Sequence, residues 1–290
     1  MQRYSLPILL FSLLAAIAFA DPIPVGPGRV VLGKEEPIEV FTYRPPTYVD
    51  GPLILIFHGV GRNAEEYRNF AITLAERFGA IIAAPHFDKA RFPYNDYQQG
   101  GILREGVARP RGDWTFSRLP AMISALQEGA GNPRLPYYIL GHSAGGQFVA
   151  RLAATAGALG AQRLIAANPG SHLFPTREAK YGYGFGGLPD ELANDEAIKR
   201  FLAAPLTLYL GTADNDPNHP SLDRSEAALL QGPHRYGRGL NCFATAQELA
   251  RSRGWAFNWR KVEVDGIAHE AARMFAAPEA ENALFGASRP

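Results

Sequence analysis

The sequence predicts an α/β protein in which one mostly parallel β-sheet is covered by helices on both faces. Two observations predict this fold class. Short runs such as residues 53–57, Leu-Ile-Leu-Ile-Phe, are apolar throughout, as in strands that are buried on both faces. Amphipathic segments alternate with these runs, and strands joined by helical crossovers lie parallel in one sheet.

The expected strands are rich in aliphatic or β-branched residues and are bounded by Gly, Pro or polar turns. About eight strands fit the chain, at residues 30–32, 38–43, 53–57, 80–84, 137–140, 164–167, 206–210 and 258–264. The expected helices carry apolar residues three and four positions apart. They lie at residues 64–78, 114–127, 147–155, 190–202, 243–253 and 270–275.

Composition indicates one globular domain over residues 21–290 and excludes several other classes. Of 290 residues, 47% are hydrophobic and 20% are charged, so the chain is neither disordered nor fibrous. Lys and Arg number 29 against 28 Asp and Glu, which leaves no basic surface for binding nucleic acid. Cys242 is the only cysteine, which excludes an intramolecular disulfide, and we expect a buried thiol near the start of a helix.

Residues 1–20 have the features of a secretory signal peptide. Arg3 precedes an apolar run at residues 6–19, and residues 18–20, Ala-Phe-Ala, form an A-x-A cleavage pattern. The run is shorter than the ~20 residues that a membrane-spanning helix needs. We therefore expect cleavage after Ala20 and a secreted or periplasmic protein with no stable membrane span.

Three connections are unusually long: residues 86–113, 169–188 and 215–239. Loops longer than ~12–15 residues in a compact domain are usually functional. Each of the three follows the carboxyl end of an expected strand, and open α/β sheets bind their ligands at that edge. A ligand site is therefore expected where these connections meet.

Gly141-His142-Ser143-Ala144-Gly145 matches the pattern G-x-S-x-G. The motif follows the expected strand at 137–140 and opens the helix expected at 147–155. Such a strand–turn–helix is a nucleophile elbow, whose sharp turn exposes the serine hydroxyl at the sheet edge. The glycines are needed because a Cβ at their positions would crowd the strand and the helix. Ser143 is therefore the expected nucleophile.

A serine becomes nucleophilic when a base takes its proton, and an acid should orient that base. His269 is the expected base because it lies between the last expected strand and the last helix. Asp214 is the first carboxylate after the strand at 206–210, and Asp216 stands two residues further on. The order nucleophile, acid, base supports His269 as the base. Its position directly after the strand favours Asp214 as the acid, with Asp216 left open as the alternative.

Acyl transfer also requires donors for the oxyanion of the tetrahedral intermediate. The segment 57–61, Phe-His-Gly-Val-Gly, follows the third expected strand, where this architecture takes one backbone donor. The N–H groups of Val60 and of Ala144, next to the nucleophile, are the expected oxyanion hole.

These motifs together resemble the α/β-hydrolase superfamily, and the resemblance covers nearly all of the chain after residue 20. His58-Gly59, the Ser143 motif with Gly146, Gly211-x-x-Asp214 and Gly266-x-x-His269 stand in the order of that superfamily. Ile56-Phe57-His58-Gly59 with Arg62-Asn63-Ala64 and Tyr67 is most similar to exported esterases of the poly(3-hydroxybutyrate) depolymerase and feruloyl-esterase kind. The resemblance implies a three-layer α/β-hydrolase fold. Secreted depolymerases of this kind often carry disulfides, which one cysteine cannot form, so attack on polymers stays open.

The expected activity is hydrolysis of a carboxylic ester through an acyl-enzyme on Ser143, without a metal or organic cofactor. The expected partner is a small-molecule or oligomeric ester. Two alternatives stay open. A serine peptidase of the same fold would use the same triad, and a ligand-binding protein on a hydrolase scaffold would be expected to have lost a triad member.

The substrate is less defined by the sequence. Residues 181–187, Tyr-Gly-Tyr-Gly-Phe-Gly-Gly, lie in a connection where hydrolases often build pocket walls. Tyr181, Tyr183 and Phe185 are expected to line an apolar acyl or aryl site. The alternative is a flexible glycine-rich surface loop.

Overall fold

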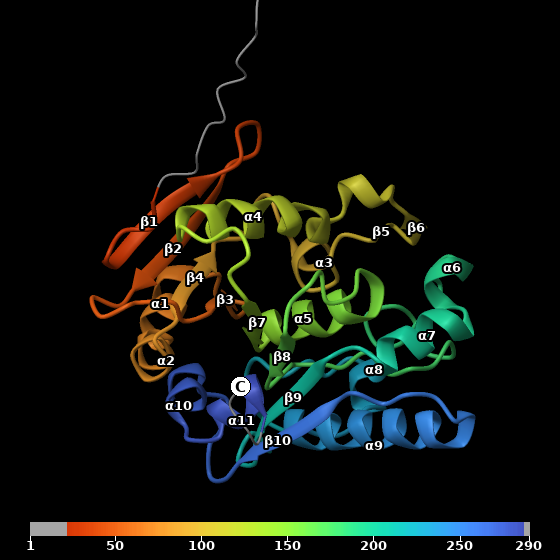
Figure 1. Cartoon of the computed structure of the whole chain (residues 1–290). Coiled ribbons are helices and arrows are strands. Elements are labelled where there is room, and N and C mark those ends of the chain that lie inside the picture. The colour runs from red at the N-terminus through yellow and green to blue at the C-terminus, as the bar shows by residue number, and fades with distance from the viewer. Residues whose placement is uncertain (1–21, 287–290) are drawn as a thin grey trace, which may run out of the picture.

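Eight strands form one sheet in the computed structural model, which describes residues 22–286 (Figure 1). From edge to edge they are β1 (Gly26–Leu32), β2 (Ile38–Arg44), β4 (Ile81–Pro85), β3 (Leu53–Phe57), β7 (Tyr137–His142), β8 (Arg163–Ala167), β9 (Leu206–Gly211) and β10 (Arg260–Val264). β2 pairs antiparallel with β1 and β4, and all other neighbours are parallel. The predicted sheet is confirmed; the predicted signal peptide, residues 1–20, lies outside the described residues.

Helices cover both faces of the sheet. One layer contains α1 (Ala64–Phe70), α2 (Ile72–Phe78), α10 (Ala271–Ala276) and α11 (Ala280–Phe285). The other contains α4 (Leu119–Gly129), α5 (Ala144–Thr155), α7 (Asp195–Leu202) and α9 (Arg235–Arg253). The long connections hold α3 (Tyr94–Tyr97), the hairpin β5–β6 (Leu103–Arg104 and Val107–Ala108), α6 (Asp190–Ala193) and α8 (Glu226–Leu229), and two 3₁₀ turns, Arg111–Asp113 and Thr115–Arg118, precede α4. No helix within residues 22–286 is long and apolar enough to cross a bilayer.

Alternate residues of each central strand face opposite helical layers. In β3, Leu53, Leu55 and Phe57 join the core beneath α4 and α5. Ile54 and Ile56 join the core beneath α1 and α10. All five are fully buried, because a strand covered on both faces must be apolar at every position rather than at every second one.

Several helices differ from their expected bounds. The segment expected at 190–202 is two helices, α6 and α7, while α4 begins at Leu119 and α5 at Ala144. The segment expected as one helix at 64–78 is two helices that meet at Ala71, and α9 begins at Arg235 rather than at residue 243. Cys242 consequently lies in the middle of α9 and not near a helix start. Burial raises the pKa of the Cys242 thiol, and its Sγ contacts a backbone carbonyl, as expected for a structural thiol.

The turn that joins β7 to α5 is too tight for any side chain at its glycines. A Cβ on Gly145 would overlap the carbonyl oxygen of Phe57 in β3, and one on Gly141 would overlap the Gly145 carbonyl. A Cβ on Gly146 would lie 2.8 Å from the carbonyl oxygen of Ala167 in β8. The glycines therefore allow α5 to begin directly against three strands.

This packing predicts that Gly145→Ala destabilises the fold. A methyl group at this position must displace the backbone of β3, and overpacking of a well-packed interior costs about 1–3 kcal/mol. Urea unfolding followed by circular dichroism measures the loss. Gly112→Ala is the matched control, because a Cβ on Gly112 meets no atom within 4 Å. Equal unfolding midpoints for the two variants would contradict the prediction.

Candidate active site

Ser143 lies at the carboxyl end of β7, in the turn before α5. Its backbone has φ 59° and ψ −115°, a conformation that residues with a side chain rarely adopt. Its N–H donates to the carbonyl of Ala167 in β8 at 2.9 Å, which anchors the turn to the neighbouring strand. The nucleophile-elbow geometry predicted from the motif is present.

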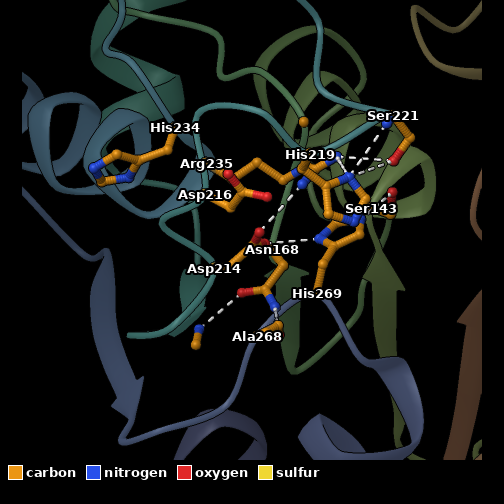
Figure 2. Close-up of polar contacts among 12 residues, drawn as sticks. Ser143, Asn168, Asp214, Asp216, His219, Ser221, His234, Arg235, Ala268 and His269 are labelled. Atoms are coloured by element: carbon orange, nitrogen blue, oxygen red, sulfur yellow. Dashed lines mark hydrogen bonds and ion pairs between the residues drawn. The ribbon is translucent and has the colours of Figure 1, made fainter.

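Ser143, His269 and Asp214 form one hydrogen-bonded chain (Figure 2). His269 Nε2 lies 2.9 Å from Ser143 Oγ, and His269 Nδ1 lies 2.7 Å from Asp214 Oδ2. The three residues follow the carboxyl ends of β7, β10 and β9, which meet at one edge of the sheet. In this arrangement the imidazole can take the hydroxyl proton while the carboxylate holds the opposite ring nitrogen.

Asp216, the alternative acid, is separated from this chain. Its side chain is exposed, and Oδ1 accepts a hydrogen bond from the N–H of Asn218 at 2.8 Å. That contact stabilises its own turn, as Asp commonly does. The geometry therefore favours Asp214 as the partner of the histidine.

A second side chain, which the sequence did not single out, contacts Asp214. Arg235 Nη1 donates to Asp214 Oδ1 at 3.2 Å, and Nη2 donates to Ser221 Oγ at 3.0 Å (Figure 2). Arg235 Nη2 also lies 3.3 Å from Nδ1 of His219, whose ring packs edge-on against His269. Both oxygens of the Asp214 carboxylate are thus engaged.

Asn168 connects the loops that carry the acid and the base. Its Oδ1 accepts from the N–H of Gly211 at 2.8 Å, and its Nδ2 donates to the carbonyl of Ala268 at 3.1 Å. With φ 41°, Asn168 adopts the left-handed region that Asn tolerates better than most residues. The only sequence signal was its position directly after the strand expected at 164–167. The side-chain amide of Asn168 thereby links the end of β9 to Ala268, the residue before His269.

His58 and His142 are buried supports of the site. Burial is the largest cause that lowers the pKa of His58 to about 3 and that of His142 well below its usual range. His58 Nε2 accepts the N–H of Phe87 at 3.1 Å, which ties the loop after β3 to the end of β4. His142 packs against His269 with tilted rings, whose centroids are 4.7 Å apart. Burial therefore favours the neutral form of both rings.

The two predicted oxyanion donors border the nucleophile. Ala144 is the first residue of α5. Val60 follows Gly59, on which a Cβ would lie 3.7 Å from the Cβ of Ser143. Among residues 22–286, neither amide N–H donates to a backbone carbonyl. Both residues line a cavity together with Ser143, so their N–H groups are the candidate oxyanion donors.

Two cavities meet at the nucleophile. The histidine-side cavity, about 410 Å³, is lined by Gly59, Val60, Gly61, Asn63, Tyr67, Phe70, His142, Ser143, Ser221 and His269–Ala272. The loop-side cavity, about 630 Å³, is lined by Val60, Tyr94, Gln98, Gln99, Ser143, Ala144, Gln147, Gly170, Tyr183, Pro220–Asp223 and Arg235. Val60, Ser143 and Ser221 border both cavities. All three long connections contribute to the loop-side cavity, as their lengths predicted.

Of the three aromatic residues predicted to line the substrate site, only Tyr183 does so. It borders the loop-side cavity, and its hydroxyl donates to Asp223 at 2.6 Å. The predictions for Tyr181 and Phe185 are wrong: both side chains are buried in the core, and Phe185 packs against Phe201. Close backbone hydrogen bonds fold the glycine-rich segment back on itself and turn these two side chains inward.

Metal ligands do not gather at the site. Among the residues that the structure describes, no group of three or more His, Cys, Asp or Glu side chains could hold a metal ion. The polar side chains around Ser143 instead bond to one another.

Solved structures include relatives over nearly the whole chain. Poly(aspartic acid) hydrolase-1 from Sphingomonas sp. KT-1 is 34% identical, with a TM-score of 0.80 over 88% of this chain and 96% of that chain. LpqC, a poly(3-hydroxybutyrate) depolymerase from Bordetella parapertussis, is 31% identical, with a TM-score of 0.82 over 92% of each chain. The siderophore hydrolase EstB from Aspergillus nidulans, at 16% identity and a TM-score of 0.53 over 91% of this chain and 97% of that chain, shares the fold. No protein-family model and no curated protein matches the chain.

The similarity to these two hydrolases extends over 88% and 92% of this chain and over almost their full lengths. The eight-stranded sheet and the elbow geometry agree with it. The chain therefore belongs to the α/β-hydrolase superfamily of serine hydrolases, in the group of esterases and depolymerases that includes LpqC.

Proposed function

We propose that the protein is a serine carboxylic-ester hydrolase that works through an acyl-enzyme on Ser143. The observation that carries the proposal is the hydrogen-bonded chain from Ser143 through His269 to Asp214. A hydroxyl 2.9 Å from an imidazole nitrogen is within the range for proton transfer.

In the acylation half, Ser143 Oγ attacks the ester carbonyl carbon while His269 Nε2 takes its proton. Asp214 accepts the Nδ1–H bond and stabilises the imidazolium that forms. The carbonyl oxygen becomes an oxyanion, which the N–H groups of Val60 and Ala144 would bind. Collapse of the intermediate breaks the bond to the alcohol oxygen, which receives the proton from Nε2.

In the deacylation half, water replaces the departed alcohol beside His269. The imidazole takes a proton from this water, whose oxygen attacks the acyl carbon. The second tetrahedral intermediate collapses with return of the proton to Ser143 Oγ and release of the carboxylic acid.

The positions of the two cavities suggest which part of the ester each receives. The leaving oxygen must reach His269 Nε2, and His269 lines only the histidine-side cavity. We assign that cavity to the alcohol part of the ester. The loop-side cavity, which contains Ala144, would hold the acyl part, and openings on both sides of Ser143 suit an ester that is extended in both directions.

The relatives leave two substrate classes to compare. LpqC is a poly(3-hydroxybutyrate) depolymerase, which supports an oligomeric hydroxyacyl ester as the substrate. The second candidate is poly(aspartic acid), after which the Sphingomonas relative is named. Hydrolysis of this polymer would correspond to the peptidase alternative. Product release from 3-hydroxybutyrate oligomers and from poly(aspartic acid), measured side by side, decides between them.

We expect the wild-type protein to bind a fluorophosphonate covalently and Ser143→Ala to remain unlabelled.

We also expect kcat/KM for p-nitrophenyl butyrate to rise with pH through one ionisation, because only neutral imidazole accepts the serine proton. Asp214→Asn should lower kcat by about 10⁴, the loss that this replacement causes in chymotrypsin-type proteases, because it favours the wrong imidazole tautomer.

Asp216→Asn is the matched control, since it changes an equally charged residue two positions away that is exposed. It should retain most of the activity. Loss of activity in Asp216→Asn alone would move the acid to Asp216. A folded wild-type protein that is not labelled would favour the ligand-binding alternative.

Different outcomes are expected for the aromatic residues at the loop-side cavity. Tyr183→Ala should raise KM for esters with long acyl groups and change the unfolding midpoint little, because this side chain is only partly buried and borders the cavity. Phe185→Ala should instead lower the free energy of unfolding by about 3–5 kcal/mol, the usual cost of removing a buried Phe side chain. Steady-state kinetics across an acyl-length series and urea unfolding measure both. A KM effect from Phe185→Ala with unchanged stability would restore that residue to the substrate site.

We further propose that the enzyme acts outside the cytoplasm. The support is the sequence of residues 1–20, with its apolar run and Ala-Phe-Ala pattern. Expression of the full chain in a Gram-negative host, followed by mass spectrometry of the periplasmic fraction, should give a mature protein that begins at Asp21. Ala20→Asp should block cleavage and accumulate the precursor, because the site requires a small residue. A cytoplasmic protein that retains Met1 would refute the proposal.

A further inference from the structure

We propose that Arg235 is a positioning residue for the triad acid, and that its charge sets the pH range over which the enzyme works. The inference rests on the proposed function, since it assigns a role to a partner of Asp214. It starts from the geometry at the beginning of α9.

The start of α9 holds Asp214 at two points. The N–H of Tyr236 donates to the backbone carbonyl of Asp214 at 3.0 Å. The guanidinium of Arg235 donates to Oδ1 of the carboxylate at 3.2 Å, while Oδ2 faces His269 at 2.7 Å. A carboxylate that is bound at its backbone and at both oxygens has one orientation, and that orientation sets the plane of the imidazole.

The two side chains of the pair are almost fully buried. The side chains of Arg235 and Asp214 are 2% and 4% exposed. Among the described residues, Asp214 is the only carboxylate in a salt bridge with Arg235. Charges that are withdrawn from water act on each other over short distances with little screening, so the guanidinium opposes part of the field that the carboxylate exerts on His269.

Arg235 also connects the acid to the cavities. Its Nη2 donates to Ser221 Oγ at 3.0 Å, and Ser221 borders both cavities beside Ser143. Ser221 Oγ in turn lies 3.1 Å from His219 Nδ1. The guanidinium of Arg235 therefore positions both the Asp214 carboxylate and Ser221, which lies between the two cavities.

The other titratable groups near His269 do not account for the electrostatic effect that we assign to Arg235. His142 from the elbow and His219 from the acid loop both have lowered pKa values, chiefly through burial and then through positive neighbours. Glu270 follows His269 in the chain, but its carboxylate pairs with Arg273 at an exposed position. Asp216 is exposed, and its carboxylate accepts a hydrogen bond from the N–H of Asn218. The charged groups next to the base are therefore Asp214 and Arg235.

Removal of the guanidinium charge should favour imidazolium. Arg235→Met leaves the Asp214 carboxylate without its cation, so the protonated form of His269 becomes more stable and the carboxylate itself gains protons more readily. Both effects move the acid limb of the kcat/KM profile to higher pH, by roughly half a unit to one unit. Loss of the tether should also reduce kcat by roughly ten- to a hundredfold.

The experiment compares pH profiles of p-nitrophenyl butyrate hydrolysis for the wild type, Arg235→Met and Arg235→Lys. Lysine keeps the charge and loses the forked geometry, so we expect a lower kcat with the acid limb within about 0.2 pH units of wild type. Arg224→Met is the matched control for loss of a positive charge, since Arg224 is an exposed residue of the same connection. It should leave both kcat and the acid limb unchanged.

The outcomes separate this inference from the proposed function. An active wild type whose acid limb is the same in Arg235→Met would overturn the role of Arg235 and leave the triad intact. A wild type that hydrolyses no ester and does not react with a fluorophosphonate would overturn the function itself.

If Arg235→Met does not fold, the downfield proton resonance of His269 Nδ1–H in Arg235→Lys replaces its pH profile. A resonance that shifts or broadens relative to wild type supports a positioning role, because the imidazole–carboxylate bond has changed. An unchanged resonance together with wild-type kcat means that Arg235 is only structural.

Discussion

The whole site depends on the close approach of α5 to the sheet at the end of β7. Ser143 is held at φ 59° because the residues on either side have no room to relax. Gly141 and Gly145 lie against each other and against β3, and Gly146 lies against β8. A strained nucleophile persists only where the surrounding packing determines it completely, and here that packing is the core of the sheet itself. The position of the Ser143 hydroxyl is therefore fixed by the packing of α5 against the sheet.

The loops opposite the elbow lack such regular support, and two buried arginines replace it. Arg151 donates to backbone carbonyls of Gln147, Ser171 and Gly182, and Arg238 donates to those of Gly170, Gly232 and Asp223. Both side chains are fully buried without a carboxylate partner among the described residues. Irregular loops leave carbonyls unpaired, and a guanidinium offers five donors in a fixed plane. Contacts between the arginine charges and backbone carbonyl dipoles thus hold the wall of the loop-side cavity. In a sheet, hydrogen bonds between neighbouring strands have this role.

The strands, the elbow and the Ser143–His269–Asp214 set could be predicted because each has a local signal, namely an apolar run, a glycine pattern or a position after a strand. Arg235 could not, since its contact depends on where α9 begins. The first turns of α9 contain glycines, which are poor helix formers, so the sequence places the start eight residues too late. Gly239 is there for packing: a Cβ would lie 2.7 Å from a methyl carbon of Leu210 in β9. Tertiary contact overrides local propensity at this point and brings the arginine to the acid.

The environment of the base follows from the same packing. His269 lies between two other imidazoles, with ring centroids 4.7 Å from His142 and 5.6 Å from His219. Three histidines so close together would oppose one another if all were protonated. Burial lowers the pKa of both neighbours, and the positive charges of Arg235 and of protonated His269 lower them further. The two flanking rings are thereby kept neutral, and of the three rings only His269 contacts both the Ser143 hydroxyl and the Asp214 carboxylate. The Arg235 cation also helps to keep the flanking rings neutral, so in the proposed mechanism the proton of Ser143 moves to His269 and not to its neighbours.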